Sequence, residues 1–394
     1  MRSRSTVLFV VATTIGVVGF APSIANAANG SCVQSQGVYA KGTPWAQSLI
    51  DAARIWPLST GAGITVAVLG TGVDPSNAQF APGAVKPMIS STSGVGGAVD
   101  CAGYGTFAAG IVAAQQNPST TFAGIAPGAH ILPVRFTDTG PSNDQGADPV
   151  ALATAITDAV NAHASVILVA VPATTDDPTL RAAVQAAHDA GDVVVAPAIG
   201  NQNGQSSYPA ADPGAISVAA LNESGAAALG QSNAAESGAI AAPGTDLVGM
   251  AANTGGAVGQ VWSLQDPSFA SAAYVAGVIA LMRAYQPLSG LTPDEIANRL
   301  TATASKPAND ANLGAGIVNA YAAVTAELPA TNGKSGLSNR PVQIAAANNA
   351  TGPADRIAGL IAILGVLLAG VVVIAARSIR RAKARGWRIG VLRS

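Results

Sequence analysis

One stretch constrains the fold more than any other, the run Ile-Thr-Val-Ala-Val-Leu-Gly-Thr-Gly-Val-Asp at residues 64–74. It predicts a buried strand that leads into a glycine turn, because apolar and β-branched residues fill its first six positions. Such strands are typical of parallel sheets that are covered on both faces. In these sheets the chemistry usually lies where a central strand ends. Here that position is Gly70, which has no side chain.

The body that follows alternates between strand and helix patterns. Strands are predicted at 130–136, 166–171 and 193–196, and helices at 149–163 and 179–190. This rhythm predicts an α/β fold with a mostly parallel, doubly wound sheet flanked by helices. A further helix is predicted to open at Thr292 and Glu295, which have the spacing of a capping box.

The two ends of the chain carry patterns of export and membrane anchoring. The N-terminal end has a basic start, an apolar run and then Ala25-Asn26-Ala27, as in a secretory signal peptide. An uncleaved membrane anchor is the alternative. Residues 357–376 are uncharged and long enough to cross a bilayer, and seven basic residues follow them; a buried core helix is the alternative here. We therefore expect a single-pass protein of the cell membrane with an extracytoplasmic body. The expected parts are a signal peptide (1–27), an N-terminal extension (28–60), a body (61–328), a linker (329–356), a transmembrane helix (357–376) and a cytoplasmic tail (377–394).

Charge is distributed unevenly, although the formal net charge of the chain is only −1. Residues 28–376 hold 11 basic and 21 acidic residues, whereas both ends hold basic residues and no acidic ones. An acidic body argues against nucleic acid as a partner. The basic tail favours contact with the anionic lipid of the membrane.

The chain has two cysteines, Cys32 and Cys101, both in the part that we expect outside the cytoplasm. An even count in an oxidising compartment favours one disulfide, and two buried free thiols are the alternative. No Cys, His and Asp cluster with metal-ligand spacing is present, and no phosphate-binding loop. The sequence therefore predicts no metal site and no cofactor.

A series of short motifs runs along the body, each weak alone but specific in this order. They are Gly124-Ile125-Ala126-Pro127, Val134-Arg135, Gly200-Asn201, Tyr208-Pro209-Ala210, Ala241-Ala242-Pro243-Gly244 and Gly314-Ala315-Gly316. In this order they resemble the landmarks of the subtilases, the peptidase S8 family of serine proteases. Together with residues 43–47 and 58–63 they resemble the mycosins, the membrane-anchored subtilisin-like proteins of type VII secretion systems. The resemblance covers about residues 43–327; it implies a subtilisin-like fold and a mycosin-like pairing of Cys32 with Cys101.

The resemblance also implies a catalytic triad, from which this chain departs. A serine protease needs a nucleophile, a base and a carboxylate that orients the base. Gly70 replaces the aspartate of a motif like Val-Ala-Val-Ile-Asp-Thr-Gly-Val, and Tyr104 replaces the histidine of Asp-Gly-His-Gly-Thr. Tyrosine, with an unperturbed pKa of about 10, is a poor base at neutral pH. The three histidines of the chain, His130, His163 and His188, fall on other predicted elements, where a structural role is expected.

The nucleophile position can be assigned in two registers. Counting back without gaps from Gly277 places Phe269 there, whereas one inserted residue places Ser268 there. In both registers the preceding Gly-Thr of the family has become Asp266-Pro267, a good N-cap and N1 pair. We therefore expect Ser268 to be a first-turn residue of a helix that runs to about residue 285.

Asn201 keeps the position of the oxyanion donor, but a donor without a nucleophile and a base has little to stabilise. In subtilisin the loss of the serine or the histidine alone lowers turnover by about 10⁶. We therefore interpret the chain as a mycosin-like protein that keeps the subtilase fold without the protease chemistry. The resemblance implies a structural role in a type VII secretion membrane complex, with components of that complex as partners.

Two other functions stay open. One is an active serine endopeptidase with a rearranged site that uses Ser268 and an unorthodox base. The other is a peptide-binding module whose cleft holds a segment without cutting it.

Overall fold

The structure is a computed structural model that describes residues 32–90, 99–141, 146–199, 206–228, 240–265, 267–306, 313–328 and residue 381. The chain divides into two units, Met1–Leu328 and Pro329–Ser394. The predicted signal peptide, linker and transmembrane helix lie outside the described residues, as does Asn201. Among the residues that are described, no helix is long and apolar enough to cross a membrane.

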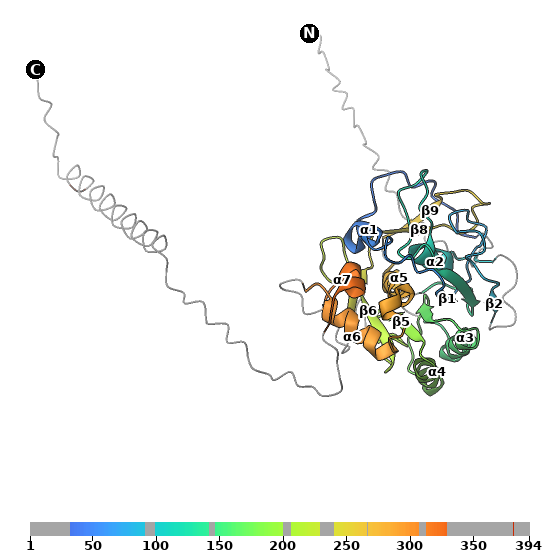
Figure 1. Ribbon diagram of the computed structural model, residues 1–394. Helices are drawn as coiled ribbons and strands as arrows, with labels where there is room; N and C mark the ends of the chain where they lie inside the picture. Colours follow the sequence, from blue (N-terminus) through green and yellow to red (C-terminus); the bar gives the residue numbers. More distant parts are fainter. Residues whose placement is uncertain are drawn as a thin grey trace, which may run out of the picture. The chain divides into compact units, whose positions relative to one another are not determined.

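In the described part of the first unit, a seven-stranded parallel sheet lies at the centre (Figure 1). Its spatial order is β2-β3-β1-β4-β5-β6-β7. The strands are β1 (Thr65–Gly70), β2 (Ile89–Ser90), β3 (His130–Arg135), β4 (Val166–Val169), β5 (Val193–Pro197), β6 (Ala215–Leu221) and β7 (Ile240–Pro243). A separate antiparallel hairpin pairs β8 (Leu247–Met250) with β9 (Val261–Leu264).

Helices cover both faces of this sheet (Figure 1). The elements are α1 (Trp45–Ile50), η2 (Ala52–Arg54), α2 (Tyr104–Ala113), α3 (Pro149–Asn161), α4 (Pro178–Asp189), η3 (Ser268–Ala270), α5 (Ser271–Ala284), η4 (Gln286–Leu288), α6 (Pro293–Thr303) and α7 (Ala320–Thr325), where η marks a 3₁₀ helix. Helices α3 and α4 pack on one face, and α2 and α5 on the other. The sheet therefore lies between two helical layers.

Strand β1 shows why the apolar run at 64–69 needs cover on both sides. Val66 and Val68 belong to the core that contains α2 and α5, whereas Ala67 and Leu69 belong to the core that contains α3 and α4. All four side chains are fully buried. Because neighbouring side chains of a strand point to opposite faces, a strand with two buried faces must be apolar throughout.

One local prediction is confirmed, and another can be followed only in part. Thr292 and Glu295 form the predicted capping box at the start of α6. The helix predicted from about residue 266 to 285 opens with the 3₁₀ turn η3, which contains Ser268, and continues as α5 from Ser271. Asp266, of the predicted cap pair, lies outside the described residues. Pro267 precedes η3 without a side-chain cap. Ser268, Phe269 and Ala270 are all buried, so this turn belongs to the core.

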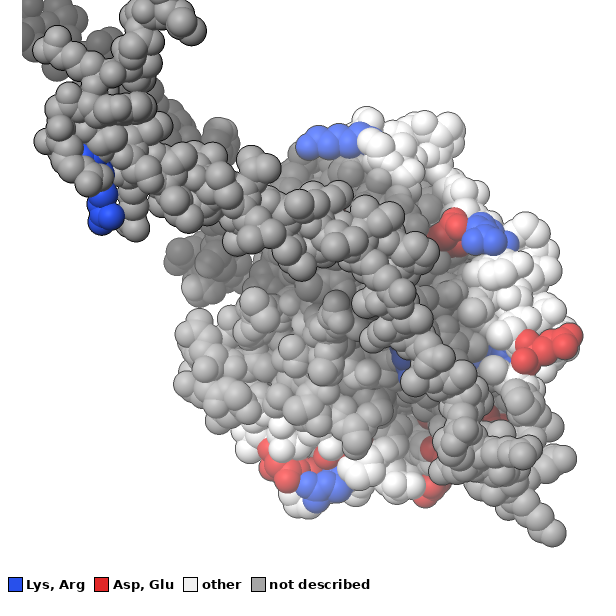
Figure 2. Space-filling view, turned by 90° about the vertical axis from the view of Figure 1, so that its left-hand side faces the viewer, with Lys and Arg blue, Asp and Glu red and all other residues white. Residues whose placement is uncertain are grey.

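Surface charge is sparse on the described part of the face that Figure 2 shows, where charged side chains lie in a few separate groups. Among the described ion pairs, Arg54 with Asp51 and Arg181 with Asp176 join side chains that are about half exposed or more. Exposed pairs of this kind contribute only about 0–1 kcal/mol each. The stability of this unit therefore comes mainly from its apolar cores.

Candidate functional site

Gly70 is the last residue of the central strand β1 and is buried. A Cβ atom added there would lie 3.3 Å from the Cβ of Ala170 and 3.5 Å from Cγ2 of Val171. The first contact is somewhat tight and the second is an ordinary van der Waals contact, so a side chain here would pack against the segment that follows β4. A carboxylate at this position would enter apolar surroundings.

Tyr104 begins α2, directly against the turn that follows β1. A Cβ atom on Gly105 would lie 1.8 Å from the carbonyl oxygen of Gly72, so the first turn of α2 can touch this turn only without a side chain. Gly72 itself has φ of +104°, in the region that favours glycine. The Gly-Thr-Gly turn thus brings the end of β1 and the start of α2 into contact.

Four aromatic side chains pack together at this place; we call Tyr104, Phe107, Trp262 and Phe269 the aromatic cluster. The ring centroid of Tyr104 lies 5.2 Å from that of Trp262 and 5.2 Å from that of Phe269, both edge to face. Phe107 lies 6.0 Å from Trp262 and 5.8 Å from Phe269. Phe269 is only 3% exposed. Tyr104 and Phe269 are therefore in direct ring contact. The family resemblance assigns the base to the first position and, in the ungapped register, the nucleophile to the second.

Tyr104 is also covered from the loop that follows β3. A Cβ atom on Gly140 would lie 2.0 Å from a ring carbon of Tyr104, so the backbone of Gly140 lies directly on the ring. Burial raises the pKa of the Tyr104 phenol above its ordinary value of 10.0. The hydroxyl therefore stays protonated at neutral pH and cannot act as a general base there.

Ser268, the other candidate nucleophile, lies in the turn η3 and is 5% exposed. Its carbonyl oxygen accepts a hydrogen bond of 2.9 Å from the hydroxyl of Ser271. The hydroxyl of Ser271 lies 3.3 Å from the carbonyl oxygen of Val218 as well, which ties the turn to β6. Ser268 thus belongs to a packed turn at the start of α5.

The three histidines lie at the opposite edge of the sheet from Gly70. His130 opens β3, His163 precedes β4 and His188 belongs to α4, which leads into β5. All parallel strands here run in one direction, so residues that precede strands lie at the amino edge and Gly70 lies at the carboxyl edge. The structure does not bring a histidine of the chain to the cluster. Within the described ranges, no group of three or more His, Cys, Asp or Glu residues could hold a metal ion.

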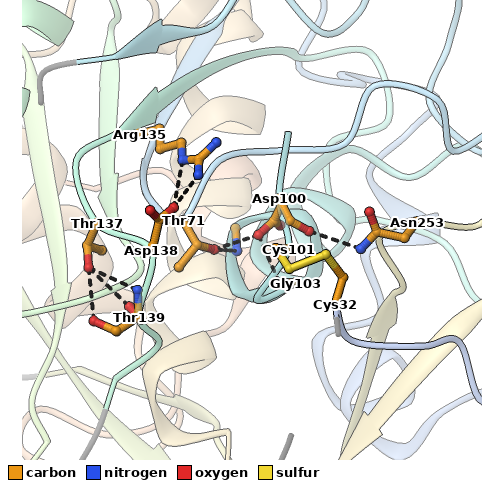
Figure 3. Close-up of polar contacts among 11 residues, drawn as sticks. Cys32, Thr71, Asp100, Cys101, Gly103, Arg135, Thr137, Asp138, Thr139 and Asn253 are labelled. Carbon is orange, nitrogen blue, oxygen red and sulfur yellow. Dashed lines mark hydrogen bonds and ion pairs between the residues drawn. A yellow bond between two sulfur atoms is a disulfide. The ribbon is translucent and has the colours of Figure 1, made fainter. Parts of the chain in front are cut away.

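A buried carboxylate that the sequence analysis did not single out, Asp100, lies beside the start of α2 (Figure 3). Its Oδ1 accepts hydrogen bonds of 2.8 Å from the Thr71 hydroxyl and 2.8 Å from the Gly103 amide. Its Oδ2 accepts from the amide and the hydroxyl of Thr106, at 2.8 and 2.6 Å. Burial raises the pKa of Asp100 above its ordinary value of 3.8, while these hydrogen bonds oppose the rise. Asp100 therefore ties the turn after β1 to α2 and faces no base.

Asp74, the carboxylate nearest to Gly70 in the sequence, has a similar structural role. Its Oδ1 accepts from the Ser76 amide at 2.9 Å, and its Oδ2 accepts from the Asn253 amide at 2.7 Å. The side-chain amide of Asn253 donates to the Asp100 carbonyl oxygen at 3.1 Å (Figure 3). Asp74 is thus engaged with backbone amides and does not orient a base.

The disulfide Cys32–Cys101 is present beside this network (Figure 3). The Val33 amide donates to the Cys101 carbonyl oxygen at 2.9 Å, so backbone and sulfur atoms both join the N-terminal extension to the turn before α2. The bridge closes a loop across a sequence separation of 69 residues. In the chain-entropy model a loop of this length gives roughly 4 kcal/mol of stabilisation.

The fold and the order of these elements define a subtilisin-like protein. The subtilase family (peptidase S8) matches residues 61–322, and the chain belongs to this family. Within it the chain is a mycosin-type subtilase. It is 32% identical to Mycosin-1 of Mycobacterium tuberculosis over 338 residues, which cover 73% of this chain and 74% of that protein. It is 31% identical to Mycosin-3 of the same organism, with 75% of each chain covered.

Solved structures agree with this assignment. The structure of MycP3 protease from the type VII (ESX-3) secretion system has a TM-score of 0.63 and 29% identity, and it covers 75% of this chain and 93% of that one. The crystal structure of MycP1 without its N-terminal propeptide has a TM-score of 0.61 and 28% identity, with 74% and 99% covered. The predicted subtilisin-like α/β fold is confirmed.

Proposed function

We propose that this chain is a membrane-anchored, mycosin-type protein that has lost subtilisin-type proteolysis and serves as a structural component of a type VII secretion membrane complex. The observation that carries this proposal is the ring contact between Tyr104 and Phe269. Acyl transfer needs a base within hydrogen-bond reach of a nucleophile. Here two aromatic rings occupy the positions that the family resemblance assigns to these groups.

The surroundings of Gly70 support the same proposal. The missing carboxylate would need an imidazole to orient, and the histidines lie at the other edge of the sheet. Ser268 has no described histidine beside it, since those residues precede or open strands at the amino edge. Ordinary subtilisin chemistry therefore lacks three of its parts.

The scaffold role draws on the relatives and on the sequence outside the described residues. The similar MycP3 structure is from a type VII secretion system. The uncharged segment 357–376 and the seven basic residues after it support a single span with a cytoplasmic tail. Each basic residue near anionic lipid contributes about 1 kcal/mol of attraction. A packed surface and a span require no catalytic triad.

Labelling with a fluorophosphonate probe tests the loss of catalysis. We expect no labelling of the full-length protein and no hydrolysis of peptide substrates. Ser268→Ala is the matched variant and should give the same result. Labelling that Ser268→Ala abolishes would instead support a serine endopeptidase with a rearranged site.

Complementation of a deletion strain tests the scaffold role, with secretion and integrity of the complex as readouts. Removal of residues 357–394 should abolish function. Tyr104→Phe or Asn201→Ala, at the old active-site positions, should leave function nearly intact. Full rescue by a chain that ends at residue 328, or loss of rescue from these two changes in a folded protein, would favour the peptide-binding module.

The segment after β4 bears on that last alternative. Ala173 exchanges two backbone hydrogen bonds of 2.9 Å with Tyr208, and the Ala147 amide donates to the Pro172 carbonyl oxygen at 3.0 Å. An extended peptide usually binds by adding to an open strand edge. Both edges of this segment are engaged by the chain itself, which favours the scaffold role over peptide capture at this place.

A further inference from the structure

The segment Val33–Tyr39, which we call the strap, lies as an additional strand along the hairpin β8–β9. The Gln36 amide donates to the Val261 carbonyl oxygen at 2.9 Å, and the Val261 amide donates to that of Gly37 at 3.0 Å. The Tyr39 amide donates to the Gly259 carbonyl oxygen at 3.1 Å. The strap therefore occupies the backbone edge that β9 would otherwise present.

One end of the strap reaches the aromatic cluster. Val33 is 5% exposed and belongs to the same core as Phe107 and Trp262. A Cβ atom on Gly103 would lie 2.5 Å from Cγ1 of Val33 and 3.3 Å from the Trp262 ring. Val33 thus lies directly against Gly103, beside the ring of Trp262 and next to the start of α2.

The rest of the strap lies near the surface, where hydrogen bonds hold it, including those of the Ser35 and Gln36 side chains with Gln260 and Ser263. Val33 is its one buried residue, residues 34–39 are half-buried or exposed, and Val38 is 50% exposed. Segments with few buried apolar contacts and solvent-exposed backbone hydrogen bonds open locally at low free energy. A covalent bond at the end of such a segment therefore decides whether it stays closed.

That bond is the disulfide of Cys32, the residue directly before the strap, with Cys101. Cys101 follows Asp100, whose carboxylate is fixed by Thr71, Gly103 and Thr106. The hydrogen bonds of Asp100 thus fix the position of Cys101 and do not depend on the disulfide. Loss of the disulfide would therefore free the strap, while the turn around Cys101 keeps its structure.

We infer that the Cys32–Cys101 disulfide is a redox switch. Its reduction releases the strap from β9, and this exposes the backbone edge of β9 and the Trp262 side of the aromatic cluster. The reductant is a dithiol, which transfers two electrons and two protons to the sulfur pair and becomes its own disulfide. The products in this chain are the thiols of Cys32 and Cys101. Thiol–disulfide exchange with an oxidised dithiol, which takes up the two electrons and two protons, restores the closed state.

Hydrogen exchange of the full-length protein, followed by mass spectrometry, tests this inference with dithiothreitol as the dithiol. Reduction, verified by the mass gain of two hydrogens, should speed exchange in peptides that cover residues 33–39 and 259–263 about tenfold or more. At exchange times at which the strap has exchanged, peptides from α4 should stay protected. The variant Cys32→Ser/Cys101→Ser should behave like the reduced protein, and reductant should not change it further.

A matched pair of variants tests whether the packing of Val33 helps to keep the strap in place. In the oxidised protein, neither Val33→Ser nor Val38→Ser should release the strap. After reduction, Val33→Ser should exchange faster than the wild type in residues 33–39, whereas Val38→Ser, on an exposed position of the same segment, should match the wild type. Unchanged exchange in the strap after verified reduction would overturn the inference. Loss of protection in α4 at the same exchange times as in the strap would overturn it too, because the disulfide would then act only through the stability of the whole domain.

Discussion

The rings of Tyr104 and Phe269 meet edge to face with their centroids 5.2 Å apart, although one begins α2 and the other lies in the turn before α5. In a subtilase with an intact triad, the resemblance places a histidine and a serine at these two positions. In this chain two rings pack at these positions, and their contact joins the start of α2 to the turn before α5.

This contact predicts a measurable coupling. Phe269→Ala removes a side chain that is 3% exposed and should lower the free energy of unfolding by about 3–5 kcal/mol. A double-mutant cycle with Tyr104→Ala should give a coupling energy of about 0.5–1.5 kcal/mol. Tyr104→Phe keeps the ring and should cost much less. Urea unfolding followed by circular dichroism measures all of these, and a coupling near zero would show that the rings do not pack as described.

Restoring the missing carboxylate should harm the protein. Gly70→Asp places a Cβ atom 3.3 Å from the Ala170 methyl group and a carboxylate in a buried, apolar place. We expect a loss of about 1–3 kcal/mol or more from the unpaired polar group. Gly70→Ala, which adds the Cβ atom alone, is the control and should cost less. Neither variant should hydrolyse peptides, because no histidine lies at this edge for the aspartate to orient.

Asp192, at the start of β5, predicts a dependence of stability on pH. Desolvation raises its pKa from 3.8 to about 6, against the opposing charges of Arg283 and His163. Because the folded-state pKa is the higher one, the folded protein holds this proton more tightly than the unfolded chain does. The stabilisation is complete below pH 3.8 and is lost as the pH rises through about 6.

Asp192→Asn removes this dependence. Relative to the wild type, the variant should gain free energy of unfolding between pH 4 and pH 7.5. Urea unfolding at the two pH values measures the gain. Glu223→Gln, in an exposed turn after β6, is the control and should follow the wild type. A variant whose difference from the wild type is the same at both pH values would contradict the assignment.

We expect Arg299 to stabilise α7, the last helix of the described body. From α6 it donates to the carbonyl oxygens of Ala323, Val324 and Ala326, and it is only 9% exposed. These carbonyls end α7, a helix of six residues that needs tertiary support. Arg299→Met should therefore lower the free energy of unfolding by about 2–3 kcal/mol, because it leaves buried acceptors without a donor.

Hydrogen exchange separates this effect from a general loss of stability. Arg299→Met should speed exchange in residues 320–328 more than in α4. Arg299→Lys keeps the charge but loses the planar fork, and it should restore only part of the protection. Equal exchange in all three proteins would show that α7 does not depend on Arg299.

Local features of this protein were predictable because neighbouring residues decide them. The apolar run at residues 64–69 specified a strand with two buried faces, and Thr292 with Glu295 specified a helix start. The start of α5 was not predictable in the same way. Its Asp-Pro pair predicts a helix start, but it does not show that Phe269 packs against α2.

The Asp100 network also escaped prediction, for a related reason. An aspartate in a loop is normally exposed, and nothing in its neighbouring residues shows that four donors will converge on it. They do so because Gly72 and Gly105 allow the turn after β1 to touch the first turn of α2. Glycine spacing was the available signal, but it shows where a close approach is possible and not which carboxylate fills it.

The sequence by itself determined what the site lacks, because a glycine, a tyrosine and a phenylalanine at positions 70, 104 and 269 have side chains of fixed chemistry. Only the tertiary structure decided what takes the place of the missing groups. Ring packing depends on the distances from α2 to β9 and η3, which lie far from α2 along the chain. Such distances are set by the packing of whole layers, and no local pattern of residues encodes them.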